Sequence, residues 1–207
     1  MEAYGAQMKR AAVFIDRDGT INEQKGYINH ISRFEILPGV AEAIRLLNDL
    51  GFLAIVVSNQ SGVARGYYPL ELVHEIHALL KKTLKEEAGA TVDAILFCPH
   101  YPQGRVPEFS MDCECRKPKT GLIDQACASF DIDLSRSFMV GDMCSDMEFA
   151  NRAGIKGILV KTGYGLGEIE HVLPRMETKP IHVARDLLDA VQWIVHGEEA
   201  YRHRSTP

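Results

Sequence analysis

The sequence predicts an α/β fold, namely a Rossmann-like, mainly parallel sheet with helices on both faces. Short apolar runs recur along the 207 residues, and stretches with helical periodicity lie between them. The runs are continuous rather than alternating, which is typical of strands that are covered on both faces. Alternating strands and helices are the pattern of parallel sheets joined by helical crossovers. Hydrophobic residues make up 46% of the chain, which is enough to fill the core of such a fold.

The first half of the chain predicts two strands and two helices. The apolar run 11–15 predicts the first strand, and the run 53–57 predicts the second. Between them, apolar side chains at helical spacing from Val40 to Leu50 predict a helix, and Gly51 suits its end. A second helix is predicted over 69–88, because a proline stands at its start and a glycine follows it.

The second half continues the alternation. Apolar runs predict strands at 92–97, 137–140 and 157–160. Helical patterns are predicted at 121–130, 145–153 and 184–196. Cys127 lies on an apolar helix face and is expected in the core. His74 and His77 share a helix face without partner ligands, so a solvated face is expected for both.

Residues 1–207 are expected to form a single domain, because this length is usual for one domain. A net charge of −5 argues against nucleic acid as a partner. No apolar run reaches membrane-spanning length, and residues 1–10 lack the apolar core of a signal peptide. No coiled-coil pattern or large apolar seam is visible. We therefore expect a cytoplasmic monomer with no membrane partner.

An acidic motif, Ile15-Asp16-Arg17-Asp18-Gly19-Thr20, follows the first apolar run. In extended backbone, residues two apart share a face, so Asp16 and Asp18 are expected on one side and Arg17 on the other. Two carboxylates this close repel each other unless a cation lies beside them or one carries a proton. The motif predicts a metal site, an acid–base pair or both, with an ordinary pair of loop acids as the alternative.

Polar residues end two further predicted strands. Ser58-Asn59 follow the second strand, and Gly141-Asp142 follow the fourth. Functional groups in open parallel sheets gather outside the carboxyl ends of the strands. Neighbouring strands would therefore bring these groups and the acidic motif into one crevice. The crevice is also expected to receive Asp146 and the cations Arg116, Lys117 and Lys119.

Such a crevice has the groups needed for phosphoryl transfer. Carboxylate oxygens suit Mg²⁺, which commonly binds beside phosphate, and lysine, hydroxyl and backbone N–H groups suit the phosphoryl group. One carboxylate can attack phosphorus and form an aspartyl-phosphate. A second, two residues on, can protonate the leaving alkoxide and later take a proton from the hydrolytic water. Helix capping is the alternative role for Asp142 and Asp146.

Three cysteines and a histidine form two tight pairs, Cys98-Pro99-His100 and Cys113-Glu114-Cys115. These ligand types at this spacing predict a tetrahedral zinc site. Four protein ligands leave no open position, so the zinc would be structural and would hold the loop 98–115. A disulfide and unrelated buried thiols are the alternatives, and a reducing compartment argues against the first.

Together, the acidic motif, Ser58, a loop lysine and Gly141-Asp142 with Asp146 resemble the four signatures of the haloacid dehalogenase superfamily. The resemblance covers most of the chain and implies a haloacid dehalogenase-like fold. It implies that Asp16 is the nucleophile and Asp18 the general acid and base. Ser58 and Lys117 would stabilise the phosphoryl group as further catalytic residues. Mg²⁺ would be held by the Asp16 carboxylate, the Asp18 backbone carbonyl and Asp142.

Within the superfamily, the zinc loop resembles two zinc-bearing subfamilies: heptose-bisphosphate phosphatases and histidinol-phosphate phosphatases. The stretches 59–66, 98–104 and 113–118 look most like the former, and 119–121 leave the latter open. The resemblance implies that Arg116 recognises the phosphate that is not cleaved. It also implies a set of substrate-binding residues: Gln24, Lys25, Gly26, Tyr27, Ser58, Asn59, Gln60, Ser61, Arg116 and Lys117. Arg65, between Ala64 and Gly66, is a further candidate for a substrate contact, with an ordinary loop cation as the alternative. The segment between Thr20 and Pro38 is short, as is the loop 60–68, so no large cap domain is expected.

These residues predict a Mg²⁺-dependent phosphoric monoester hydrolase that acts on a small phosphorylated sugar. The main hypothesis is removal of the C7 phosphate of a heptose 1,7-bisphosphate, on the route to nucleotide-activated heptose and the lipopolysaccharide core. Histidinol phosphate is the alternative substrate. An alternative of another class is a phosphate-binding zinc module without turnover, against which the full set of acids and cations argues.

Overall fold

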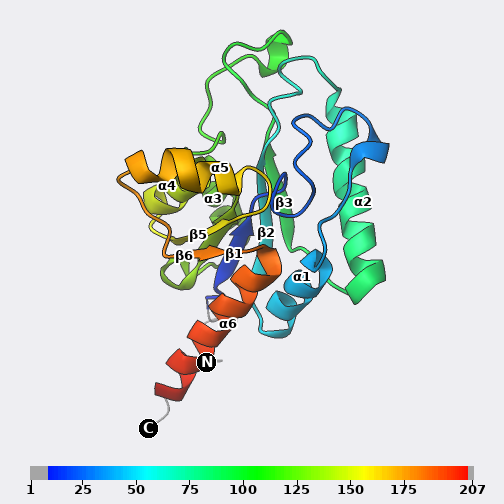
Figure 1. Ribbon diagram of the computed structural model, residues 1–207. Coiled ribbons are helices and arrows are strands. Elements are labelled where there is room, and N and C mark those ends of the chain that lie inside the picture. Colours follow the sequence, from blue (N-terminus) through cyan, green and yellow to red (C-terminus); the bar gives the residue numbers. More distant parts are fainter. Residues whose placement is uncertain (1–8, 205–207) are drawn as a thin grey trace, which may run out of the picture.

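The computed structural model describes residues 9–204 and contains a six-stranded sheet in the order β3-β2-β1-β4-β5-β6 (Figure 1). All neighbouring strands pair in parallel. The strands are β1 (Ala12–Ile15), β2 (Leu53–Asn59), β3 (Ala94–Cys98), β4 (Phe138–Gly141), β5 (Lys156–Val160) and β6 (His182–Ala184). The predicted parallel α/β fold is confirmed.

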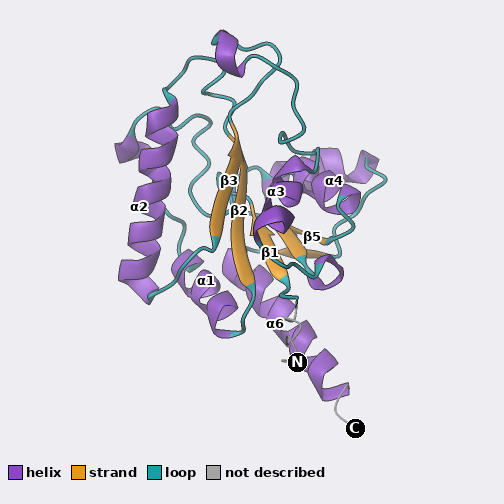
Figure 2. Cartoon of the chain, turned by 180° about the vertical axis from the view of Figure 1, so that it is seen from behind, coloured by secondary structure: helices purple, strands orange, loops and turns teal. Residues whose placement is uncertain are grey.

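Helices connect the strands and cover both faces of the sheet (Figure 2). They are α1 (Val40–Asp49), α2 (Leu70–Ala88), α3 (Gly121–Ser129), α4 (Cys144–Arg152), the short α5 (Gly165–Gly167) and α6 (Leu187–Arg204). None of the helices in the described part of the chain is long and apolar enough to cross a membrane. Pro69 stands immediately before α2 and Gly89, with a φ of 62°, ends it, as the sequence predicts.

The core has two layers because side chains alternate along each strand. Val13 and Ile15 of β1 pack in a cluster with buried residues of α1, α2 and α6. Ala12 and Phe14 point the other way and pack with α3 and α4. Every residue of β1 is therefore buried, which explains why the strand is a continuous apolar run.

Long loops follow the carboxyl ends of β1, β2 and β3. They gather beyond one end of the sheet, where the loop after β3 rises highest (green in Figure 1). The loop after β3 docks on the loop after β2: the backbone N–H groups of Arg105 and Val106 both donate to the carbonyl oxygen of Ala64, at 2.7 and 3.0 Å. Main-chain bonds thus fix the position of the loop 98–115.

Away from the acidic motif, the structure differs from the predictions at one strand and in the side chains of Cys127 and His77. Residues 182–184 form β6, so α6 begins at Leu187 rather than at residue 184. This edge strand is too short to show a periodicity in the sequence. Cys127 is exposed rather than packed in the core, and His77 is buried rather than solvated. The sheet neighbour Phe97 packs against the His77 ring, with the ring centroids 5.2 Å apart.

Candidate active site

A cavity of about 370 Å³ lies at the carboxyl ends of β1, β2 and β4. β1 pairs with β2 on one side and with β4 on the other, so the polar residues that end these strands come close together. Those of β1 and β2 line the cavity, whereas Asp142, which follows β4, is fully buried and lies outside the lining. The residues that line the cavity are Asp16, Asp18, Gln24, Gly26, Tyr27, Ser58, Asn59, Ser61, Arg116, Lys117, Met143, Ser145, Asp146 and Tyr164.

Lys117 is the buried cation of this cavity. Its ammonium group donates to Oδ1 of Asp16 at 2.6 Å, to Oδ1 of Asp146 at 2.7 Å and to the carbonyl oxygen of Val57 at 3.0 Å. Burial alone would lower the pKa of Lys117, but the charges of Asp146 and Asp16 outweigh it and raise the pKa above its usual range. Lys117 therefore stays protonated and links Asp16, at the end of β1, to Asp146 of α4.

The carboxylates outnumber this cation. Burial, with Lys117 opposing it, raises the pKa of Asp16 to about 7. Burial and the nearby charge of Asp16 raise the pKa of Asp142 to about 8. Both acids are thus held in a site that disfavours their charged forms. A divalent cation between them would reverse this and favour the carboxylates.

The carboxylate of Asp142 lies in a cradle of backbone. A Cβ built on Gly19 or on Gly163 would lie 2.2 Å from its Oδ2, and both glycines have a positive φ. The backbone N–H of Tyr164 donates to the same oxygen at 2.8 Å. The other oxygen, Oδ1, is buried and has no hydrogen-bond partner. An acceptor left in this way fits a cation ligand.

Oxygen atoms of Asp16, Asp142 and Asp146 lie within 4.8 Å of one another, a spacing that could hold a metal ion. Both oxygens of Asp146 already have partners: Oδ1 accepts from Lys117, and Oδ2 accepts from the backbone N–H of Met143 at 3.2 Å and so caps α4. Helix capping, the alternative role predicted for this acid, is therefore present at Asp146. Asp16 and Asp142 are the acids that fit Mg²⁺ best.

Arg17 does not point away from the acids, so that prediction was wrong. Its Nη2 donates to both carboxylate oxygens of Asp18, at 2.9 and 2.7 Å, and its side chain is only 2% exposed. Its Nη1 lies 3.3 Å from Nε2 of His77, which must be the acceptor because a guanidinium only donates. Desolvation lowers the pKa of His77 to about 3, so the imidazole is neutral. A buried network thus joins α2 to the acidic motif.

Asp18 is held as a carboxylate. Burial would raise its pKa, but the charge of Arg17 and hydrogen bonds from Asn22, Arg17 and Gln60 outweigh burial and lower it. The amide of Gln60 donates to Oδ2 of Asp18 at 2.8 Å and lies 2.6 Å from the hydroxyl oxygen of Ser58. The environments of the two acids therefore push their pKa values apart, downward for Asp18 and upward for Asp16.

Asn59 fixes the loop that carries Lys117. Its side-chain amide donates to the carbonyl oxygen of Lys117 at 3.1 Å and accepts from the backbone N–H of Lys117 at 3.0 Å. Other cations of the predicted set lie elsewhere. Lys25 pairs with Glu35, Lys119 pairs with Asp112 and Glu114, and Arg65 stands beside Tyr101, outside the cavity lining.

Met143, Ser145 and Tyr164 line the cavity, although the sequence did not mark them as substrate contacts. Met143 and Ser145 lie between Asp142 and Asp146 in the sequence, so their place in that motif could have identified them as cavity residues. Tyr164 follows β5, whose end carries no acidic signature. Its position depends on the backbone turn that brings Gly163 against Asp142.

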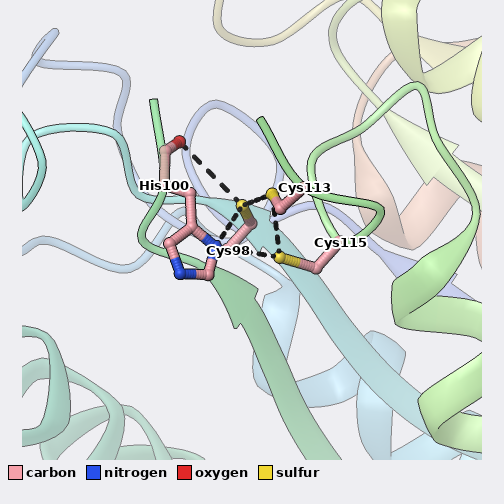
Figure 3. Close-up of side chains that lie close together, drawn as sticks. All are labelled: Cys98, His100, Cys113 and Cys115. Carbon is pink, nitrogen blue, oxygen red and sulfur yellow. Dashed lines mark hydrogen bonds between the residues drawn. The ribbon is translucent and has the colours of Figure 1, made fainter. Parts of the chain in front are cut away.

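The two Cys/His pairs come together in space, and Figure 3 shows the four side chains pointing toward one another. The sulfur of Cys98 lies 3.4 Å from that of Cys113, and the sulfurs of Cys113 and Cys115 are 3.2 Å apart. Nδ1 of His100 lies 3.3 Å from the Cys115 sulfur. A disulfide needs sulfurs about 2.0 Å apart, so the cysteines are free. The set fits a tetrahedral ion bound by thiolates and an imidazole.

The sheet order and the acids at its carboxyl end are those of a haloacid dehalogenase-like hydrolase. A family model described as HAD-hydrolase-like matches residues 114–190. A protein of Thermosynechococcus vestitus named D-glycero-D-manno-heptose-1,7-bisphosphate 7-phosphatase is 43% identical over 90% of this chain and 96% of its own length. A Haemophilus ducreyi protein named as the beta-anomer 7-phosphatase is 39% identical over 90% of this chain and all of its own length.

A solved structure agrees with these relatives. The D,D-heptose 1,7-bisphosphate phosphatase of B. bronchiseptica, complexed with magnesium and phosphate, has a TM-score of 0.79 and 29% identity. The match covers 90% of this chain and 99% of that one. The chain therefore belongs to the D-glycero-D-manno-heptose-1,7-bisphosphate 7-phosphatase family of haloacid dehalogenase-like hydrolases.

Proposed function

We propose that this protein is a Mg²⁺-dependent phosphatase that removes the C7 phosphate of D-glycero-D-manno-heptose 1,7-bisphosphate and leaves heptose 1-phosphate. The observation that carries the proposal is the buried cluster of Asp16, Asp142 and Lys117 at the carboxyl end of the sheet. The names of the related proteins support the substrate. The product would feed the synthesis of nucleotide-activated heptose and of the lipopolysaccharide core.

Asp16 is the proposed nucleophile. Lys117 binds its Oδ1, and no donor among the described residues binds its Oδ2, which is left to attack phosphorus. Attack forms the bond between Oδ2 and phosphorus and breaks the bond between phosphorus and the C7 oxygen. Lys117 and the Ser58 hydroxyl hold the transferring phosphoryl group and offset its charge. Water then hydrolyses the aspartyl-phosphate and releases inorganic phosphate.

Asp18 is the proposed general acid and base. A phosphate dianion in the cavity raises the pKa of a neighbouring carboxyl, which counters the effect of Arg17 and lets Asp18 carry a proton. Asp18 gives this proton to the leaving C7 alkoxide and later takes one from the attacking water. Each turnover thus returns Asp18 to its starting state.

The proposed Mg²⁺ ligands are the Asp16 carboxylate, the Asp18 backbone carbonyl and Asp142. When bound, the ion supplies the positive charge that lets a carboxylate approach a phosphate dianion. The proposed zinc ligands are Cys98, His100, Cys113 and Cys115. They leave no open position, so this metal would be structural and would hold the loop 98–115.

The substrate would lie along the cavity from Asp16 to Arg116. Gln24, Gly26, Tyr27, Asn59 and Ser61 line this path and are proposed sugar contacts. Arg116 would bind the phosphate that is not cleaved, since a guanidinium fork matches phosphate. Gln60 would act through its bonds to Ser58 and Asp18. Lys25 pairs with Glu35 and would contact substrate only after leaving this acid.

We also propose a single domain over 1–207, a monomer in solution and a cytoplasmic location. Free cysteines and a thiolate metal site suit a reducing compartment. Size-exclusion chromatography with light scattering tests the monomer, for which one mass near 23.1 kDa is expected.

The decisive experiment compares kcat/KM for both anomers of heptose 1,7-bisphosphate with kcat/KM for histidinol phosphate. We expect a clear preference for the heptose, and a preference for histidinol phosphate would overturn the substrate. Asp16→Asn should lower kcat by on the order of 10³-fold or more, while the exposed Asp112→Asn should leave it unchanged. If the unsubstituted protein released no phosphate from any of these esters with Mg²⁺, it would be a binding module.

A further inference from the structure

The ring of Tyr101 lies next to two guanidinium groups from different loops. Cζ of Arg65 lies over the ring at 3.7 Å from its centroid, and Cζ of Arg116 lies over it at 5.3 Å. A guanidinium within about 6 Å of an aromatic centroid is attracted by the electrons of the ring face. One side chain therefore gathers two cations that are far apart in the chain.

The Cys/His cluster fixes two of these three residues. Tyr101 follows His100, and Arg116 follows Cys115, so each is bonded to a member of the cluster. Nη1 of Arg116 also donates to the carbonyl oxygen of His100 at 3.4 Å. The backbone N–H of Tyr101 donates to the carbonyl oxygen of Phe109 at 3.1 Å. The ring therefore has a defined place beside Arg116.

Loop docking brings in the third residue. Arg65 follows Ala64, whose carbonyl oxygen accepts the two backbone bonds that fasten the loop 98–115. The loops approach so closely that a Cβ built on Gly104 would lie 2.6 Å from this same oxygen. The position of Arg65 relative to Tyr101 is thus set by main-chain contacts.

The two guanidinium groups lack anionic partners in the described part of the chain. Among the described residues, no carboxylate lies within 4.0 Å of either Arg65 or Arg116. Nε of Arg65 is buried and has no hydrogen-bond partner. Arg116 lines the cavity that contains Asp16. Two like charges kept together without a counter-charge, beside a cavity, favour the binding of an anion there.

We propose that Tyr101 is a positioning residue that holds Arg65 and Arg116 as a pair for the phosphate of the substrate that is not cleaved. The proposal rests on the proposed function, because only a bisphosphate carries this second group. Tyr101 does not touch the reacting atoms. Its effect is on the recognition of the distal phosphate and therefore on KM rather than on the chemical step.

The test uses the full-length protein with Mg²⁺ and two substitutions, Tyr101→Leu and Tyr101→Phe. The first removes the ring, and the second keeps the ring and loses only the hydroxyl. For heptose 1,7-bisphosphate, we expect Tyr101→Leu to raise KM about tenfold with little change in kcat. Tyr101→Phe should stay within about twofold of the unsubstituted protein, since the ring face remains. Hydrolysis of p-nitrophenyl phosphate, which has no second phosphate, should be unchanged in both.

Three results would overturn the proposal. An unchanged KM for the bisphosphate in Tyr101→Leu would mean that the ring positions nothing. An equal loss on both substrates would mean a merely structural role. Loss in Tyr101→Phe equal to that in Tyr101→Leu would assign the effect to the hydroxyl. Failure of the unsubstituted protein to hydrolyse the bisphosphate would instead overturn the proposed function, and the role of Tyr101 with it.

Discussion

The ammonium group of Lys117 donates to Oδ1 of Asp16 over 2.6 Å, although the two residues are 101 positions apart in the chain. Asp16 stands at the end of β1, and Lys117 comes from the loop that follows the Cys/His cluster. The pair is almost fully buried, with the Lys117 side chain 3% exposed. The contribution of Lys117 to the site can be tested by substitution, with the same substitution of a surface lysine as the control.

Lys117→Met should lower kcat for p-nitrophenyl phosphate by on the order of 10²-fold or more, because the transferring group loses a preorganised cation. The charge of Lys117 lowers the pKa of Asp16, so its loss should also move the acidic limb of the pH–rate profile upward. Lys119→Met is the control, because Lys119 pairs only with exposed acids. Equal activity in the two variants would remove Lys117 from the catalytic residues.

Gly163→Ala should abolish most activity, because the added Cβ would lie 2.2 Å from Oδ2 of Asp142. Gly154→Ala is a matched control: Gly154 also has a positive φ, of 68° against 57°, but a Cβ there meets nothing within 4 Å. Both variants should lose about 1 kcal/mol or more of stability from the strained backbone. The measurement is the activity of each variant at saturating and at limiting Mg²⁺. Similar activity in the two variants would contradict the role of Gly163 in the backbone cradle around Asp142.

Mg²⁺ should raise the Tm more at about pH 8 than at about pH 6. The pKa of Asp16 (about 7) and that of Asp142 (about 8) lie above the unfolded value of about 4. The two acids therefore add to the free energy of unfolding below pH 4, and this stabilisation is lost as the pH rises through 7 to 8. A bound cation offsets this loss, so its benefit grows over the same window.

The measurement is thermal unfolding of dialysed protein with and without Mg²⁺ at each pH. His77, whose pKa is lowered to about 3, affects both samples equally and cancels in the difference. Asp142→Asn should remove most of the pH-dependent gain. A gain in Tm that is the same at both pH values would argue against these two acids as the ligands.

Purified protein should contain about one zinc ion per chain, measured by inductively coupled plasma mass spectrometry. Cys113→Ser should lose the metal and lower the Tm, since a structural zinc contributes folding energy. Cys127→Ser is the control, because Cys127 is exposed and lies outside the cluster. Absence of zinc in protein purified without chelators would leave the four side chains as free thiols and an imidazole.

Much of the fold could be predicted from the sequence because its strands are buried on both faces. β1 and β2 are continuous apolar runs for this reason, and each ends in a polar signature. Their adjacency, and that of β1 and β4, is what joins the signatures into one cavity. By contrast, β6 lies at an edge and spans three residues, too few for a periodicity to be visible.

Side-chain direction in the site could not be predicted. Arg17 turns back to Asp18 because Asp18 and His77 together offer a buried guanidinium its partners, and His77 lies on a helix far along the chain. Tyr101 is likewise one aromatic residue among several in the sequence. Its relation to Arg65 depends on how two loops dock, which is a tertiary property.

The docking of the loop 98–115 on Ala64 uses backbone atoms of Arg105 and Val106. Main-chain bonds of this kind are indifferent to the side chains that the two residues carry. Substitutions along the rim of the loop can therefore accumulate without shifting its path. A library randomised at such rim positions, with the Cys/His ligands and Gly104 kept, would be a starting point for directed evolution toward other sugar phosphates. The hydrolytic centre would stay unchanged.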